Sequence, residues 1–309
     1  MRPLVLSLFS AAFVVGCGAD TIQAPSPSVL PPLLAHAQSA SAKTFTFISI
    51  DVPDAVFTGG SGINPRGDIV GTYRDASGRS HGYVLRNGEF STINFPDAEG
   101  VVVRGTDARG IGPSGEIVGS YTVVGEPAVN AHGFLLTKHG EFVAVNYPGH
   151  TNTIAQRVLP DGTILGCRHD GDLMDTMRGI LITGSDSGEI SQFASMNNGA
   201  TPDHRQIVGL YTNMANSQQG YLIDDGVFKP LFVGDIPTTA AWDMNSAGEI
   251  VGVFIKAGVH GFVLRDQDYV QIDFPGATAT RVFGINPRGD LVGTYVTSDG
   301  KNHGFLARR

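Results

Sequence analysis

The sequence predicts an all-β protein, a six-bladed β-propeller in which the N-terminal strand closes the last blade. Three observations lead to this prediction: a composition rich in turn residues, a block that recurs six times, and a mismatch between the two ends of the repeat. Of the 309 residues, 41 are glycine and 17 are proline, and 16% are charged. This composition is typical of a chain built from short strands and many turns.

An apolar-apolar-Gly block recurs along the chain at a nearly constant spacing. Its six glycines are Gly71, Gly119, Gly166, Gly209, Gly252 and Gly293. The intervals between them are 48, 47, 43, 43 and 41 residues, with an average of about 44. A period of about 40 to 50 residues without helical periodicity is typical of a four-stranded propeller blade.

The order of strands within one repeat is clearest in the last copy. Residues 281–286 lead through a tight turn into residues 290–295, which gives two consecutive strands. A third strand follows a polar loop and begins with a His-Gly-aromatic triplet. In the first copy, Asn87-Gly88 then marks a two-residue hairpin turn, in which positive φ is required, and so predicts a fourth strand.

The two ends of the repeat do not match, and the mismatch predicts how the ring closes. The sixth copy ends at Arg309, after its third strand, whereas residues 45–53 match fourth strands such as 91–96 and 270–275 but have no preceding strands. We therefore expect residues 45–53 to complete the sixth blade by pairing with residues 303–308. Closure of this kind leaves no unpaired edge between the first and last blades.

The N-terminus has the pattern of a signal peptide with a lipobox, over residues 1–17. Arg2 precedes an apolar run, Leu4 to Val15, that is too short to span a bilayer. The run ends in Val14-Val15-Gly16-Cys17, which resembles the bacterial lipobox, where the cysteine receives a lipid. The alternative is an ordinary signal peptide cut near Ala35-His36-Ala37. We expect Cys17 to be lipidated and the protein to contact the membrane through that anchor alone. We therefore expect an extracytoplasmic protein, which is either an outer-membrane lipoprotein or secreted.

A tether separates this anchor from the folded domain. Residues 18–43 are rich in Pro, Ala and Ser and show neither strand nor helix periodicity, so the sequence predicts an extended linker. The propeller then spans residues 44–309. Cys167 is the second of the two cysteines, and its column in the repeat predicts a semi-buried, unreactive thiol.

Three motifs recur between residues 45 and 309: His-Gly-Phe/Tyr triplets, Asn-Pro-Arg-Gly-Asp turns and Ile-Val-Gly-Thr/Ser-Tyr strands. Together they resemble the HAF-repeat family of extracellular repeat proteins. The likeness is weakest in the third and fourth copies, where the triplet becomes Arg178-Gly179-Ile180 and Gln219-Gly220-Tyr221. The resemblance implies export and a repetitive β-fold, and it brings no established reaction and no catalytic residues.

The histidines of the triplets raise the question of a metal site. They are His81, His132, His260 and His303. Each occupies the same position of a different blade, so symmetry keeps them apart, whereas zinc requires its ligands within about 2 Å of one ion. We expect a structural hydrogen bond repeated in each blade, and we expect neither a metal nor a cofactor.

The third copy departs most from the repeat and supplies the candidate binding site. Residues 167–175 replace the usual short polar loop with a segment rich in charged and imidazole groups. In a propeller, loops between second and third strands share a face with the loops that enter each blade. We therefore predict a ligand site at the mouth of the ring beside the third blade, with Arg157 opening the inner strand on that face. The candidate residues are His150, Arg157, Arg168, His169 and Asp170. The alternative is a solvated loop that has merely diverged.

The charge of the chain argues against some partners, and its motifs rank the remaining functions loosely. The formal net charge of -8 lacks the basic footprint that nucleic acid or an anionic membrane attracts. Three classes remain: a surface binding module for a glycan or protein ligand, an envelope hydrolase or lyase acting on glycans, and a structural scaffold in an envelope complex. In the second class, His169, Asp170 and Arg168 would serve as base, acid and anion clamp. The sequence contains no recognisable catalytic motif, which favours binding over catalysis. We expect the protein to be a monomer.

Overall fold

The computed structural model describes residues 33–37, 45–150, 152–171, 173–184, 186–189, 194–266 and 268–309. The predicted lipobox with Cys17, and most of the predicted tether, lie outside the described residues. No helix within these described segments has the length and apolar character of a membrane span.

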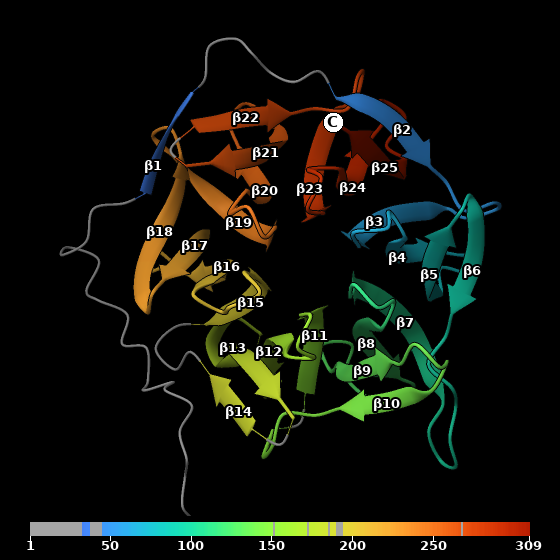
Figure 1. Cartoon of the computed structure of the whole chain (residues 1–309). Helices are drawn as coiled ribbons and strands as arrows, with labels where there is room; N and C mark the ends of the chain where they lie inside the picture. The colour runs from blue at the N-terminus through green and yellow to red at the C-terminus, as the bar shows by residue number, and fades with distance from the viewer. Residues whose placement is uncertain are drawn as a thin grey trace, which may run out of the picture.

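Six four-stranded antiparallel blades surround a central axis, as Figure 1 shows. The first blade contains β3 (Phe57–Ile63), β4 (Ile69–Arg74), β5 (Ser80–Arg86) and β6 (Glu89–Ile93). The second contains β7 (Val103–Ile111), β8 (Ile117–Val123), β9 (His132–Leu136) and β10 (Phe142–Val145). The third contains β11 (Asn152–Val158), β12 (Ile164–His169), α1 (Leu173–Thr176), β13 (Arg178–Thr183) and β14 (Asp186–Glu189).

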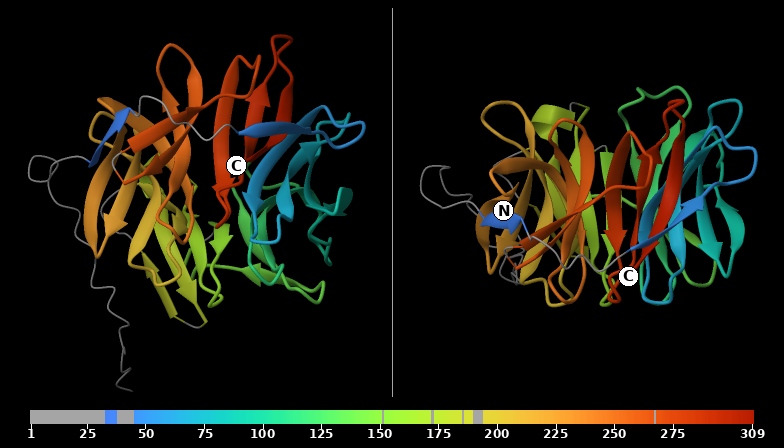
Figure 2. Two further views of the ribbon diagram at one scale, coloured as in Figure 1. Left: turned by 45° about the horizontal axis from the view of Figure 1, so that its top comes forward. Right: turned by 90° about the horizontal axis from the view of Figure 1, so that it is seen from above.

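The remaining three blades repeat this order. The fourth contains β15 (Ser195–Ala200), β16 (Gln206–Thr212), β17 (Gln218–Asp224) and β18 (Val227–Val233). The fifth contains β19 (Ile236–Met244), β20 (Ile250–Ile255), β21 (Val259–Arg265) and β22 (Asp268–Ile272). The sixth contains β23 (Ala279–Ile285), β24 (Leu291–Val296), β25 (Asn302–Arg308) and β2 (Thr46–Ile50). Viewed from the side, the blades form a disc with loops on both faces (Figure 2).

The predicted closure of the ring is confirmed. Strand β2 pairs antiparallel with β25, with Thr46 opposite Arg308 and Ile50 opposite Gly304. The side chain of Phe47 also lies 6.0 Å from that of Phe305, measured between ring centroids. The sixth blade is therefore built from both ends of the chain.

The recurring glycine lies where two strands and an aromatic ring meet. A Cβ atom added at Gly119 would overlap the backbone carbonyl oxygen of Asp107 and would lie 2.8 Å from the ring of Phe134. The equivalent overlap recurs at Gly71 and Gly293. The glycine thus leaves room for the aromatic residue that follows the His-Gly pair, as the sequence predicted.

The four triplet histidines each bond within or beside their own loop, which confirms their predicted structural role. His81 lies with Nδ1 2.8 Å from Asn94 Oδ1, and His303 with Nδ1 2.6 Å from Asp51 Oδ1. His260 pairs in the same way with Asp273, at 2.8 Å. The rings also contact the aromatic residue of the preceding strand, for example Tyr295, whose centroid lies 5.0 Å from that of His303.

Each inner strand carries a β-bulge at the same place, close to the axis. The register shifts lie at 60–62, 108–110, 155–157, 197–199, 241–243 and 282–284. A bulge bends the strand and re-aims its backbone groups. This feature, which the sequence analysis did not predict, positions the groups at the centre of the ring.

One strand lies within the segment for which the sequence predicted no regular structure. Strand β1 (Leu33–Ala37) runs parallel to β18, with Leu33 opposite Leu231, and then parallel to β22, with Ala37 opposite Tyr269. It joins the outer edges of the fourth and fifth blades (Figure 1). The C-terminal part of the predicted tether therefore contacts the propeller.

The glycine column yields a test of blade packing. We expect Gly119→Val to lower the free energy of unfolding by at least about 1–3 kcal/mol, because the new side chain must displace a backbone carbonyl and an aromatic ring. Arg288→Ala is the control, since Arg288 lies on a turn with its side chain 54% exposed, and a change of roughly 0.5 kcal/mol or less is expected. Equal shifts of the urea midpoint in the two variants would contradict this packing.

Candidate functional site

Three of the five predicted site residues come together beside the third blade, on the face of the loops that enter each blade. His150 Nδ1 lies 2.8 Å from Asp170 Oδ2, and Arg168 Nη1 lies 3.7 Å from the same oxygen. Arg168 also donates to Glu189 through Nε and Nη2, at 2.9 and 3.1 Å. We call His150, Arg168, Asp170 and Glu189 the third-blade cluster. Arg168 is already paired with the carboxylates of Glu189 and Asp170, so it is not free to act as the predicted anion clamp.

The side chain of His169 is not part of the third-blade cluster. Its side chain is fully buried, and neither ring nitrogen has a hydrogen-bond partner among the described residues. Burial lowers the pKa of His169, and the nearby Asp170 offsets part of that effect. The lowered pKa favours the neutral imidazole, and the buried ring does not face solvent together with Asp170, as the predicted base and acid would have to.

Arg157 lies at the other end of the third blade, where the sequence analysis did not expect it. It is the sixth residue of β11 (Asn152–Val158), so it closes the inner strand instead of opening it. Because an inner strand runs from the entry loops on one face to the first hairpin turn on the other, Arg157 is separated from the third-blade cluster by the depth of the ring. The five predicted residues therefore do not form one site.

The guanidinium of Arg157 extends to the axis, where it bonds to backbone carbonyl groups of five blades. Nη1 donates to Arg109 O and Gln156 O, each at 2.8 Å. Nη2 donates to three further carbonyl oxygens, those of Ser61 at 3.0 Å, Trp242 at 3.4 Å and Phe283 at 2.5 Å. All five carbonyls belong to the middle residue of an inner-strand bulge.

Asp243 is the acidic partner of this guanidinium and comes from the fifth blade. Arg157 Nε lies 3.3 Å from Asp243 Oδ2, and both side chains are almost completely buried. The carboxylate also accepts hydrogen bonds from Met244 N at 2.9 Å and Ile285 N at 3.2 Å. Burial raises the pKa of Asp243, and the attraction of Arg157 and these two N–H groups offsets only part of that shift.

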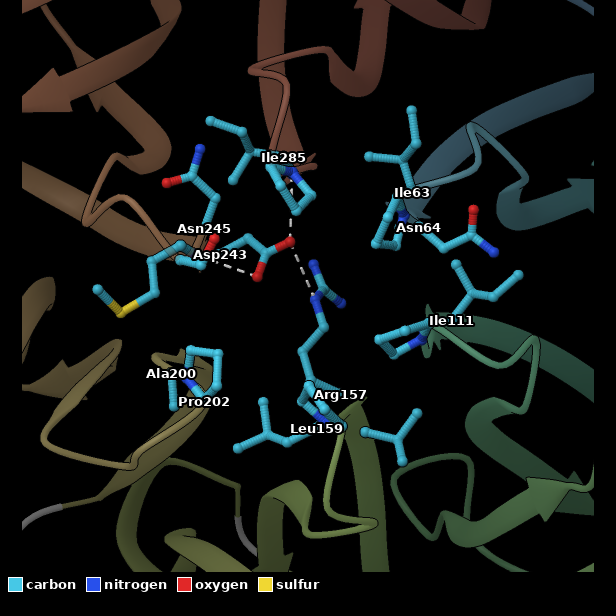
Figure 3. Close-up of a pocket in the computed structure, with 18 residues that line it drawn as sticks. Ile63, Asn64, Ile111, Arg157, Leu159, Ala200, Pro202, Asp243, Asn245 and Ile285 are labelled. Atoms are coloured by element: carbon cyan, nitrogen blue, oxygen red, sulfur yellow. Dashed lines mark hydrogen bonds and ion pairs between the residues drawn. The ribbon is translucent and has the colours of Figure 1, made fainter.

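Arg157 and Asp243 form the base of an axial funnel that opens on the face of the first hairpin turns (Figure 3). The cavity measures about 120 Å³. Each blade contributes an apolar side chain to its wall, namely Ile63, Ile111, Val158, Ala200, Met244 and Ile285, and the third blade adds Leu159. Five blades add a proline, at positions Pro65, Pro113, Pro160, Pro202 and Pro287, and the fifth blade places Ser246 there.

One column of the sequence repeat carries a signal for this funnel. The residue after each bulge is glycine in four blades, at Gly62, Gly110, Gly199 and Gly284. In the other two blades the same column holds Arg157 and Asp243, two residues of opposite charge. Aligning this column across all six copies predicts that the two side chains meet at the axis.

Cys167 is more deeply buried than the semi-buried position that its column predicted. Its side chain is fully buried, and burial raises the pKa of Cys167 to about 12. The thiolate form required for nucleophilic chemistry is therefore strongly disfavoured at neutral pH. This thiol contributes to packing with residues such as Ile154 and Met196.

Comparisons with known proteins confirm the fold. No protein-family model matches the sequence, and no curated protein matches it. Among solved structures, a gluconolactonase from Xanthomonas campestris aligns with a TM-score of 0.53 and 12% identity, covering 90% of this chain and 97% of that one. AofleA from Arthrobotrys oligospora aligns with a TM-score of 0.52 and 12% identity, covering 90% of this chain and 91% of its own. At this identity the likeness shows the propeller fold alone, and the HAF-repeat resemblance stays a prediction.

The buried carboxyl group of Asp243 predicts a pH dependence of stability. Its folded pKa is raised, so its contribution to stability is fully present below the unfolded pKa of about 3.9 and is lost as the pH rises through the folded value. In Asp243→Asn this position no longer titrates. The free energy of unfolding of the variant relative to the parent should therefore increase between about pH 4 and pH 7 in urea titrations. A difference that stays constant or decreases with pH would contradict this assignment.

Proposed function

We propose that the chain is an exported, lipid-anchored recognition module that binds its ligand in the axial funnel without catalysis. The observation that carries this proposal is the funnel itself, a concave mouth to which all six blades contribute. Binding sites for small groups are typically concave and largely apolar, with a few fixed polar groups. The funnel has this composition, with mostly apolar walls that also carry Asn64, Asn245 and Ser246, and with one pair of charged side chains at its floor.

The chemistry of the funnel favours holding a ligand over transforming it. The Nη1 and Nη2 groups of Arg157 donate to backbone carbonyl oxygens, and Nε forms an ion pair with Asp243, so the guanidinium is a fixed structural cation. Asp243 in turn accepts hydrogen bonds from two backbone N–H groups. A ligand that enters the funnel meets mostly apolar walls and, at the floor, two charged side chains that neutralise each other. This arrangement suits the apolar part of a glycan or protein ligand.

Blocking the funnel is the direct test. Ser246→Trp places a large side chain at an exposed position of the wall, where it should not disturb the core. Ala76→Trp is the matched control, because Ala76 is also exposed but lies in the loop between β4 and β5, on the opposite face. We expect ligands found for the parent on a glycan array or in a displayed peptide library to lose at least about tenfold in affinity in the first variant and to bind the control unchanged.

A third variant separates the two faces. Asp170→Ala disrupts the third-blade cluster while leaving the funnel intact. If a ligand binds Ser246→Trp as tightly as the parent but loses affinity for Asp170→Ala, the binding site lies at the third-blade cluster and the funnel proposal is wrong.

The anchor has its own test. The lipobox motif leads us to expect a mature protein that begins at Cys17 and carries diacylglycerol. Mass spectrometry of protein isolated from the membrane fraction should find this modified N-terminus. A mature chain that begins at Gln38 would show that an ordinary signal peptidase cuts after Ala37 and that no anchor is present.

A further inference from the structure

At the centre of the ring, five backbone carbonyl oxygens and one carboxylate surround the guanidinium of Arg157. The bulges turn five backbone carbonyl oxygens toward one point on the axis, and all five accept hydrogen bonds from Arg157. Each carbonyl carries the negative end of a peptide dipole. Together with the carboxylate of Asp243 they form a site of strongly negative potential that requires a positive charge.

The arrangement of acceptors matches a planar guanidinium group. Two of the carbonyl oxygens bond to Nη1 and three bond to Nη2, while Asp243 lies beside Nε. The carbonyl oxygens therefore surround the two terminal nitrogens of the guanidinium, three of them sharing the N–H groups of Nη2, while the carboxylate forms an ion pair with Nε. Their distances of 2.5–3.4 Å are those of N–H donors.

Burial supports the same conclusion. Arg157 is 7% exposed and Asp243 is 8% exposed, so the charges have little access to water. A buried charge is tolerated when hydrogen bonds replace its hydration, and the carbonyl ring supplies those bonds. Four of the six blades place glycine at the position of Arg157, which leaves the space on the axis to one side chain and its partner.

We propose that the axis of this propeller is a guanidinium-binding site built from the bulge carbonyls of five blades and from Asp243, and that Arg157 occupies it in cis. The side chain acts as a built-in central cation that ties the inner strands together. It follows that the site persists when this side chain is removed, and that it then accepts a free guanidinium ion. This inference concerns the axis itself and does not depend on a ligand in the funnel.

Chemical rescue tests the proposal in the full chain. Arg157→Gly introduces the residue that four other blades carry in this column, and it should lower the melting temperature. Low-millimolar guanidinium chloride, compared with sodium chloride at equal ionic strength, should then raise the melting temperature of this variant, since a ligand that binds the folded state stabilises it. The parent should show no rise, because its site is filled and guanidinium is otherwise a denaturant.

Arg109→Gly is the matched control for an arginine removed from an inner strand. Arg109 is the middle residue of a bulge, and its side chain bonds to Ser120 and Gln156 instead of the axial carbonyls. Guanidinium should not raise the melting temperature of this variant. If Arg157→Gly gains no more from guanidinium than from sodium, or if the control gains equally, the proposal is overturned.

Two further variants keep the test decisive if the glycine variant does not fold. Arg157→Lys retains a positive charge on a long side chain, whereas Arg157→Met retains comparable length without charge. A central cation predicts that the melting temperature falls in the order parent, Lys variant, Met variant. A Met variant as stable as the Lys variant would show that Arg157 fills space and that the carbonyl ring needs no cation.

Discussion

Every blade depends on the close approach of its second strand to the carbonyl groups of its first. At Gly119 this approach leaves no space for a Cβ atom, and the ring of Phe134 covers the same point from the third strand. The absence of a side chain at Gly119 and the large ring of Phe134 together fix the register of three strands. The histidine of the His-Gly-aromatic triplet adds a contact farther from the axis. It bonds to the loop of its own blade, as His132 does with Glu126 at 2.8 Å. The roughly constant period of the sequence is the spacing of this packing unit.

Closing six such units into a ring creates a second constraint at the axis. The bulges bring backbone carbonyl oxygens into a confined region where water has little access, and buried acceptors without donors are costly. Arg157 resolves this for five blades at once. In the fourth blade, Asn198 donates to Ala241 O at 2.9 Å, which joins that blade to its neighbour by a side-chain bond. The six-fold repeat therefore places buried carbonyl oxygens at the axis, and a side chain from a single blade supplies their hydrogen-bond donors.

Much of this architecture could be predicted from the sequence, because it rests on local patterns repeated many times. The six glycines fixed the number of blades, and the unmatched segment at residues 45–53 fixed the closure that β2 and β25 form. The grouping of His150, Arg168 and Asp170 followed from the rule that alternate loops share a face. These inferences needed strand order alone.

The axial site could not be reached in the same way, because it depends on the depth of residues within a strand. Placing Arg157 required knowing that β11 begins at Asn152, so that the arginine lies near its end. The bulge adds one residue and changes which groups face the axis, and a bulge has no strong sequence signal when its residues vary as widely as Gln156 and Trp242. The complete burial of His169 is likewise a property of tertiary packing, which charge and composition do not reveal.

Departures from a repeat are informative when they are compared within one column across all blades. When the sequence is followed along the chain, the charged residues of the irregular third copy lie close together and suggest a single site. Compared by column, the same residues separate into two groups. Arg168 and Asp170 pair locally with Glu189 and His150 on one face. Arg157 instead pairs with Asp243 of the fifth blade, the other departure from glycine in its column. Because the fourth blade lies between these two positions, the opposite charges meet at the axis, and the column that breaks the repeat therefore locates the centre of the ring.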